Sequence, residues 1–466
     1  MLRTTFFFLC CLLSLASFAQ TKPNIVFILA DDMGYGDLGC YGQKRIETPH
    51  IDQLAAGGIR FTQFYAGTSV CAPSRSALLT GQHTGHTPVR GNSEVQPEGQ
   101  LPLPDTAYTM AEMLKKAGYV TGDFGKWGLG YPGSSGTPDQ QGFDRFFGYN
   151  CQRQSHNYFP DHLWNNDTRI DYANTAASQL HYAPDLIQKE ALAFMDEHKS
   201  SPFFLYLSYT LPHAALQLPK DDSTFEYYKR KFNEKAKPIN AAWDGKGYQP
   251  QAYPHAAYAA MVTKLDTYVG QVMEKLKELG IEKNTLVVFT SDNGPHREGG
   301  NDPAFFNSSG GFRGIKRDLY EGGLRIPMIA YWPAVIKKSK VSGFAGAFWD
   351  FMPTFATLAG APAPSHTDGI SLLPEISSKG KQKEHEFLYW EFHEDGGRQA
   401  VRMGKWKGVR LNVMKEPGGA IQLYNLDTDP GETKDVAAEK PAVVKRIKKI
   451  MQNEHTENEN FPFIKK

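Results

Sequence analysis

The chain has 466 residues, of which 41% are hydrophobic and 22% are charged. That length is sufficient to bury one large core and to build a smaller second domain. With 51 Lys and Arg residues against 50 Asp and Glu residues, the formal net charge is +1. The sequence therefore has neither the broad basic field that indicates nucleic-acid binding nor the acidic excess that indicates disorder, and any anion must be recognised locally.

An apolar segment at the start of the chain is typical of a secretory signal. Arg3 precedes the run FFFLCCLLSLASF, and Ser17 and Ala19 occupy the small-residue positions that a signal peptidase needs. We predict that residues 1–19 are a cleaved signal peptide and that the mature protein is exported to the periplasm or the extracellular space. No later segment approaches the roughly 20 apolar residues of a spanning helix, so stable membrane insertion is not expected.

The five cysteines are divided by that cleavage. Cys10 and Cys11 would leave with the signal, and Cys40, Cys71 and Cys151 would remain in an oxidising compartment. Because three is an odd number, at least one of them is unpaired or modified. Whether Cys40 and Cys151 form a disulfide stays open.

Strands and helices alternate along the first three quarters of the chain. Continuous apolar runs predict buried strands at residues 25–29, 203–209 and 284–290, and YVTGDFGKWGLG at residues 119–130 is strand-like. Apolar residues at helical spacing predict helices over residues 106–118 and 261–280, each ending at a glycine. This alternation favours an α/β core with a largely parallel or mixed sheet.

The pattern changes near residue 380. Short β-rich runs at residues 386–392, 398–411 and 420–426 precede a basic helical segment at residues 442–452. Strands without helical crossovers predict a small antiparallel sheet with one helix. The predicted organisation is thus a catalytic domain at residues 20–378 and a C-terminal domain at residues 379–466, joined by the polar stretch SSKGKQKEH.

Acidic residues follow two of the predicted strands. Asp31 and Asp32 end the first run, and Asp292 and Asn293 follow the run at residues 284–290. If these strands are neighbours, four oxygen-bearing side chains meet at the carboxyl edge of the sheet, where ligands gather in α/β folds. Carboxylates so close would need a cation, and oxygen ligands suit Ca²⁺ or Mg²⁺. The alternative is that each pair caps the helix or turn that follows.

Cys71, in the stretch TSVCAPSRSALLTG, is a candidate nucleophile. Pro73 is suited to the first turn of a helix, whose free amides would favour an anion near Cys71. Arg75 adds a donor that matches tetrahedral oxyanions. The alternative is that Cys71 is a buried cysteine acting as a small hydrophobic residue.

The segment CAPSR with the trailing LLTG resembles the signature of the type I sulfatases, the formylglycine-dependent, arylsulfatase-like branch of the alkaline phosphatase superfamily. Further segments resemble this family and fall in its order: PNIVFILADDMGYGDLGCYG, TPHIDQLAAGGIRFTQFYA, GKWGLG, LPHAALQ, SDNGP, YEGGLRIP, DFMPT, DGISLLP and LYNLDTDP. The resemblance implies a large, mostly parallel mixed sheet between helices, sulfuric ester hydrolysis, and conversion of Cys71 to Cα-formylglycine by a maturation enzyme.

The resemblance also implies roles for individual residues. The metal ligands, normally for Ca²⁺, correspond to Asp31, Asp32, Asp292, Asn293 and the formylglycine from Cys71. Arg75 matches the arginine that steadies the formylglycine, and Lys126 and Lys316 match the lysines that hold sulfate oxygens. His213 matches the histidine beside the leaving-group oxygen, and Ser155 and His156 resemble a further sulfate-side pair.

One position departs from the family pattern. Gly128 stands where the family often has the histidine that acts as the base for sulfate release. His83 and His86 lie beyond the helix that Pro73 begins, so at a helical rise of 1.5 Å per residue they are expected on the order of 12 Å or more from Cys71. His156 is therefore the hypothesised substitute.

The predicted function is that of a secreted sulfatase acting on sulfate monoesters, with sulfated saccharides as the expected substrates. Two alternatives stay open: a phosphodiester or phosphonate monoester hydrolase of the same fold, and a non-catalytic protein that binds sulfated glycans. Arg153, His162 and Trp164 are candidates for lining a saccharide pocket, or the loop that carries them is simply packed.

Overall fold

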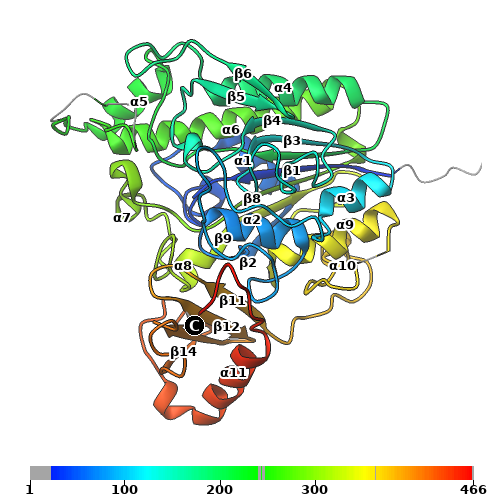
Figure 1. Ribbon diagram of the computed structural model, residues 1–466, viewed down its shortest axis with the longest axis vertical. Coiled ribbons are helices and arrows are strands. Elements are labelled where there is room, and N and C mark those ends of the chain that lie inside the picture. Colours follow the sequence, from blue (N-terminus) through cyan, green and yellow to red (C-terminus); the bar gives the residue numbers. More distant parts are fainter. Residues whose placement is uncertain (1–21, 240–242, 244–246, 363, 464–466) are drawn as a thin grey trace, which may run out of the picture.

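Ten strands form the central sheet of the computed structural model, which describes residues 22–239, 243, 247–362 and 364–463 (Figure 1). Their order is β10-β2-β9-β8-β1-β7-β3-β4-β5-β6. The bounds are β1 (Asn24–Ala30), β2 (Ile59–Tyr65), β3 (Val120–Lys126), β4 (Arg145–Tyr149), β5 (His162–Asn165), β6 (Thr168–Asp171), β7 (Phe203–Ser208), β8 (Thr285–Ser291), β9 (Arg325–Tyr331) and β10 (Lys340–Ala347).

The middle of this sheet is parallel. β1 pairs in parallel with β7 on one side and with β8 on the other, and β3 continues the parallel arrangement to β4. Antiparallel pairing occurs toward the edges, at β8 with β9 and at β4 with β5. Every residue of β1, β7 and β8 is buried, which confirms the strands predicted from continuous apolar runs.

Helices cover both faces of the sheet (Figure 1). Alternate residues of β1 serve the two cores: Val26 and Ile28 pack with α1, α4 and α6, whereas Ile25 and Phe27 pack with α2, α3 and α9. The helices are α1 (Pro49–Gly57), α2 (Cys71–Thr80), α3 (Met110–Lys116), α4 (Ala183–His198), α5 (Ser223–Phe232), α6 (Pro254–Glu278), α7 (Pro303–Phe306), α8 (Glu321–Leu324), α9 (Phe351–Ala359), α10 (Leu373–Ser377) and α11 (Pro441–Asn453).

A second, four-stranded sheet lies below the first in Figure 1. Its antiparallel strands follow chain order: β11 (Leu388–Phe392), β12 (Arg398–Met403), β13 (Trp406–Leu411) and β14 (Ile421–Asn425). One face packs on α11, and the other packs on residues of the large unit such as Trp349 and Leu324. This confirms the predicted antiparallel sheet with a helix, and the domain boundary at residue 378 stays a prediction.

A buried ionic network joins the two units. Lys407 of β13 donates to Glu321 at the start of α8, with Nζ 2.8 Å from Oε1. The Tyr65 hydroxyl donates to the other Glu321 oxygen at 2.7 Å, and the Glu321 amide donates to Glu432 at 2.6 Å. The side chains of Lys407, Glu321 and Glu432 are fully buried. Because α8 follows the loop that carries Lys316, the small sheet supports that loop.

The predicted signal peptide, residues 1–19, lies outside the described residues. Among the helices that the structure describes, none has both the length and the apolar character of a membrane span. Cys40, Cys71 and Cys151 are all free thiols, so the open question of a disulfide between Cys40 and Cys151 is answered in the negative.

We expect the stability of the fold to decrease as pH rises above neutrality. Hydrogen bonds to Asp368 and Glu391 raise the pKa values of His86 and His455 above their ordinary value of 6.5. A histidine whose pKa is raised by folding stabilises the protein fully below its unfolded pKa, and this contribution is lost as pH passes the folded pKa. We therefore expect the free energy of unfolding, measured with urea at a series of pH values, to fall less above pH 6.5 in Asp368→Asn than in the wild type. Asp196→Asn, in an exposed ion pair with Lys275, is the control; an unchanged slope in Asp368→Asn would contradict the prediction.

Candidate active site

The carboxyl ends of β1 and β8 bring two acidic pairs together. Ala30 is in register with Ser291, so Asp31 and Asp32 lie beside Asp292 and Asn293. The Asp32 amide donates to Asp292 Oδ1 at 3.0 Å, and Asn293 Nδ2 donates to Asp32 Oδ1 at 2.7 Å. All four side chains are fully buried. β1 and β8 are therefore neighbours, which is the condition under which the sequence predicted that the four side chains meet.

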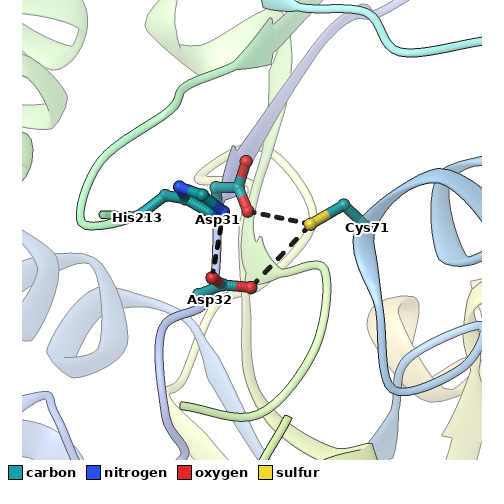
Figure 2. Close-up of side chains that lie close together, drawn as sticks. All are labelled: Asp31, Asp32, Cys71 and His213. Carbon is teal, nitrogen blue, oxygen red and sulfur yellow. Dashed lines mark hydrogen bonds and ion pairs between the residues drawn. The ribbon is translucent and has the colours of Figure 1, made fainter. Parts of the chain in front are cut away.

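Cys71 is the first residue of α2 and faces these carboxylates. Its Sγ lies 3.4 Å from Asp31 Oδ1 and 3.9 Å from Asp32 Oδ1 (Figure 2). The helix begins at Cys71, two positions before Pro73, so both residues lie in the first turn. Burial, followed by the Asp31 charge, raises the pKa of the Cys71 thiol well above its ordinary value. The unmodified side chain is therefore a neutral thiol and a poor nucleophile.

Three cations surround the carboxylates. Lys126 Nζ lies 2.6 Å from Asp31 Oδ2, and Lys316 Nζ lies 2.7 Å from Asp32 Oδ2. Arg75 contacts Asp292 at 2.9 Å and Asp31 at 3.2 Å. Burial raises the pKa of Asp31, but the nearby cations, Lys126 foremost, outweigh it and hold that pKa below its usual range. The site thus places three buried cations against three buried carboxylates.

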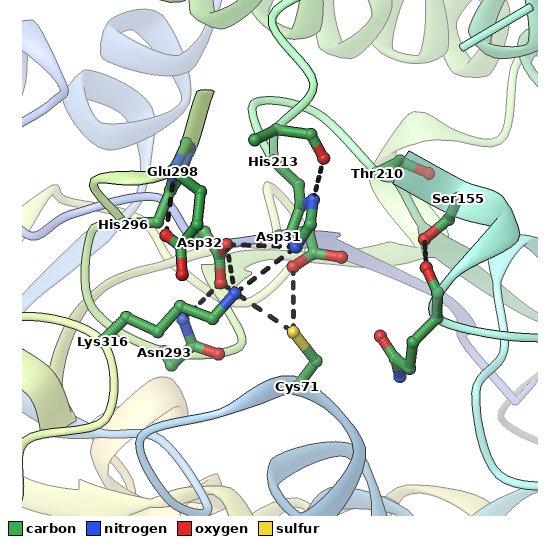
Figure 3. A network of polar contacts seen from close by, with 12 residues as sticks. Asp31, Asp32, Cys71, Ser155, Thr210, His213, Asn293, His296, Glu298 and Lys316 are labelled. Atoms are coloured by element: carbon green, nitrogen blue, oxygen red, sulfur yellow. Dashed lines mark hydrogen bonds and ion pairs between the residues drawn. The ribbon is translucent and has the colours of Figure 1, made fainter. Parts of the chain in front are cut away.

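His213 completes the cluster. Its Nε2 lies 3.4 Å from Asp32 Oδ2 and 3.4 Å from Lys316 Nζ (Figure 3). Burial and the two lysines lower its pKa well below the ordinary value, so the ring is neutral. The ring of His156 stacks on that of His213 with centroids 5.1 Å apart, and among the described residues it makes no hydrogen bond to Cys71.

The donor set fits a hard divalent cation. Asn293 Oδ1 is buried and has no hydrogen-bond partner among the described residues. Burial and the Asp31 carboxylate raise the pKa of Asp292 to about 7, as expected for a carboxylate grouped with others without a neutralising ion. Buried carboxylate and amide oxygens are ligands that Ca²⁺ prefers, so these residues could hold such an ion.

A family model described as Sulfatase matches residues 23–361. The chain belongs to the sulfatase family. A second model, described as N-sulphoglucosamine sulphohydrolase, C-terminal, matches residues 312–459. This sulfatase is therefore a sulfuric ester hydrolase, and its fold is the alkaline-phosphatase-like fold that the resemblance implied.

Relatives match over most of their length. Arylsulfatase A of Homo sapiens is 34% identical, with 92% of this chain and 87% of the relative covered. N-acetylgalactosamine-6-O-sulfatase of Bacteroides thetaiotaomicron is 30% identical, with 93% of each covered. The crystal structure of Ps i-CgsB in complex with k-i-k-neocarrahexaose superposes with a TM-score of 0.79 at 30% identity, covering 94% of each chain.

A second histidine cluster lies away from this site. His83 and His86 contact Asp368 and Glu454 in the region where the C-terminal segment meets the large unit. The Gly85 amide donates to His83 Nδ1, which places the His83 proton on Nε2 toward Glu454. The two rings are also stacked, with centroids 4.1 Å apart. Hydrogen bonds from these histidines to Asp368 and Glu454 thus connect the C-terminal segment to the large unit.

The saccharide candidates are held by nearby acids. Glu98 accepts from Trp164 Nε1 at 2.7 Å and pairs with His162 Nε2 at 2.8 Å, and Arg153 pairs with Glu94. The side chains of His162 and Trp164 are thus both engaged by Glu98 within the protein, as the packed-loop alternative predicts. Sequence reasoning missed Asn92, whose Oδ1 accepts from the Ala72 amide beside Cys71 at 3.3 Å. Nothing in one sequence places residue 92 at the start of a helix twenty positions earlier.

Proposed function

We propose that this protein is an exported sulfatase that removes O-sulfate groups from carbohydrates, with formylglycine formed from Cys71 as the nucleophile and Ca²⁺ as the bound ion. The observation that carries the proposal is the position of Cys71 against Asp31 and Asp32, with Lys126 and Lys316 at the same carboxylates. The relatives named for N-acetylgalactosamine-6-O-sulfate and the relative bound to neocarrahexaose support a carbohydrate substrate. Export rests on residues 1–19.

The proposed ligands for Ca²⁺ are Asp31, Asp32, Asp292, Asn293 and the modified residue 71. When bound, the ion would offset negative charge on the sulfate, and the hydrated aldehyde would supply one hydroxyl for attack on sulfur and a second for release of sulfate. Arg75 holds Asp292 and Asp31 in place.

The remaining residues act on the sulfate ester itself. Lys126 and Lys316 would bind its oxygens, because charge that builds up in the transition state is stabilised most by fixed cations in a dry site. Lys316 Nζ would give a proton to the departing alcohol, either directly or through His213 Nε2, which lies 3.4 Å away and would first take the proton from Lys316. His156 remains the hypothesised base for sulfate release. Burial followed by the charges of Lys126 and Lys316 lowers its pKa to about 3, so its ring is neutral but a weak base.

The deciding experiment is the mass of the tryptic peptide that contains residue 71, from protein made in its native host. A mass decrease that corresponds to replacement of the thiol by an aldehyde supports the proposal, and an unmodified thiol with sulfate turnover contradicts it. Parallel assays with the sulfate and phosphate esters of one aryl alcohol separate a sulfatase from a phosphoester hydrolase. Binding of sulfated glycans without sulfate release would favour a binding protein.

Calcium is expected to raise the midpoint temperature of thermal unfolding, because a ligand that binds only the folded chain stabilises it. Asn293→Ala removes the unpartnered oxygen and should weaken Ca²⁺ binding by at least the roughly 10- to 100-fold seen when a group behind a metal ligand is removed. Asn301→Ala is the matched control, since Asn301 Oδ1 is also buried and unpartnered among the described residues but belongs to no carboxylate cluster. Equal Ca²⁺ titrations for the two variants would be evidence against the site.

A further inference from the structure

The loop at residues 150–156 crosses the candidate site from one side to the other. At its start, the Gly128 amide donates to the Asn150 carbonyl at 3.0 Å, directly after Lys126 pairs with Tyr149. At its end, the Ala215 amide donates to the His156 carbonyl at 3.2 Å, and His156 stacks on His213. The loop therefore connects the Lys126 side of the site to the His213 side.

Gln152, in this loop, has a side-chain amide that makes no hydrogen bond among the described residues. Only 7% of the residue is exposed, and Nε2 is buried without a hydrogen-bond partner among the described residues. A buried amide that lacks a partner costs free energy, so such a group indicates a missing ligand or water. Among the described residues neither end of the Gln152 side-chain amide makes a hydrogen bond, and a 180° rotation of the amide can therefore present either end at no loss of bonding.

The position of the amide is fixed by Gly128. A Cβ at residue 128 would lie 2.1 Å from Gln152 Nε2, and Gly128 has φ of +77°, a conformation suited to glycine. The Gln152 amide thus fills the space above Gly128, two residues beyond Lys126. The main-chain carbonyl of Gln152 accepts from the Ser155 hydroxyl at 2.7 Å, and Ser155 lies across Cys71 from Lys316 in the view of Figure 3.

We propose that Gln152 binds the substrate, with its amide N–H donating to an oxygen of the sulfate ester on the side opposite Lys316. This inference rests on the proposed function. The lysines approach the site with their charges matched to Asp31 and Asp32, whereas Gln152 is a neutral donor with no competing acceptor. A sulfate ester carries several acceptor oxygens, and a neutral donor binds them without the need for a further counter-charge.

The test compares isosteric replacements at residue 152. Gln152→Met keeps the volume and removes the donor, and Gln152→Glu keeps the shape and places a carboxylate toward the anion. With 4-nitrophenyl sulfate as substrate, Gln152→Met should raise KM roughly 10- to 100-fold with a smaller change in kcat, because a bond made in both the ground and transition states is lost. Gln152→Glu should raise KM further, because its carboxylate repels the sulfate anion. Gln154→Met is the control, since Gln154 Nε2 already donates to the His162 carbonyl at 2.8 Å.

Inorganic sulfate gives a readout that does not depend on turnover. Its inhibition constant should rise with Gln152→Met and stay unchanged with Gln154→Met, while the unfolding temperatures of all variants stay near that of the wild type. If Gln152→Met folds poorly, Gln152→Asn, which withdraws the amide by one methylene, replaces it. Wild-type protein with the aldehyde but no sulfate release would refute the proposed function. An active wild type with unchanged KM and unchanged sulfate inhibition in the Gln152 variants would refute this inference alone.

Discussion

Substitution of Cys71 by alanine is expected to abolish sulfate release while leaving the fold almost as stable as before. The side chain is small and its Sγ faces two carboxylates, so its removal takes little apolar contact from the core. If residue 71 carries the nucleophile, no other group in the site replaces it, and activity should fall by about 10³-fold or more. Sulfate release and urea unfolding, measured on one preparation, check both parts.

Cys151→Ala is the matched control for this prediction. Cys151 is also a buried free thiol, but its Sγ accepts from the Gln154 amide and contacts none of the carboxylates. We expect full activity from this variant. Turnover within about tenfold of wild type in Cys71→Ala, which is about 1.4 kcal/mol in the barrier, would refute the assignment of the nucleophile.

Lys407→Met is expected to lower the free energy of unfolding by about 3–5 kcal/mol, the usual effect of removing one partner from a buried ion pair. Methionine fills a similar volume, so the loss comes from the two buried carboxylates: Glu432 loses its ion pair with Lys407, and among the described residues Glu321 keeps only the Arg325 ion pair at 3.3 Å. Because Glu321 begins the helix that follows the Lys316 loop, sulfate release should fall as well. Urea unfolding gives the free energy, and activity at low temperature gives the effect on the site.

Lys405→Met is the comparison for this effect. Lys405 lies two residues earlier, is exposed, and contacts the ring of Trp406 at 5.5 Å. Its substitution should change the free energy of unfolding by less than about 0.5 kcal/mol. Equal effects of the two variants would mean that the buried network does not stabilise the junction between the sheets.

The sequence was most informative where a local run of residues is enough to predict a buried strand. The continuous apolar runs before Asp31 and Asp292 predicted strands covered on both faces, and the carboxyl ends of such strands meet where the strands are adjacent and parallel. The C-terminal strands were also predictable, from short β-rich runs without helical crossovers between them. The helix predicted to begin at Met261 begins at Pro254 in the structure. The prediction missed its first two turns because the alanines there form no apolar stripe.

Features that depend on contacts between distant segments could not be predicted. Nothing near Lys407 in the sequence indicates that its partner is Glu321, which lies 86 positions earlier. Gly128 was interpreted as the loss of a side chain, yet the structure shows that an amide from residue 152 occupies the space. In both cases the missing information is the tertiary arrangement rather than any local preference.

The burial of Cys71 limits when another protein can reach this residue. Only 2% of the residue is exposed, and it lies in the first turn of a helix enclosed by both the sheet and the ion cluster. If Cys71 is converted to formylglycine as proposed, the modifying enzyme would need access to this residue, and the folded chain does not give that access. Modification and folding would then compete kinetically, and a molecule that folds first would retain its thiol. Slower folding, or a richer supply of the modifying enzyme, would raise the active fraction of a preparation without changing any atom of the finished site.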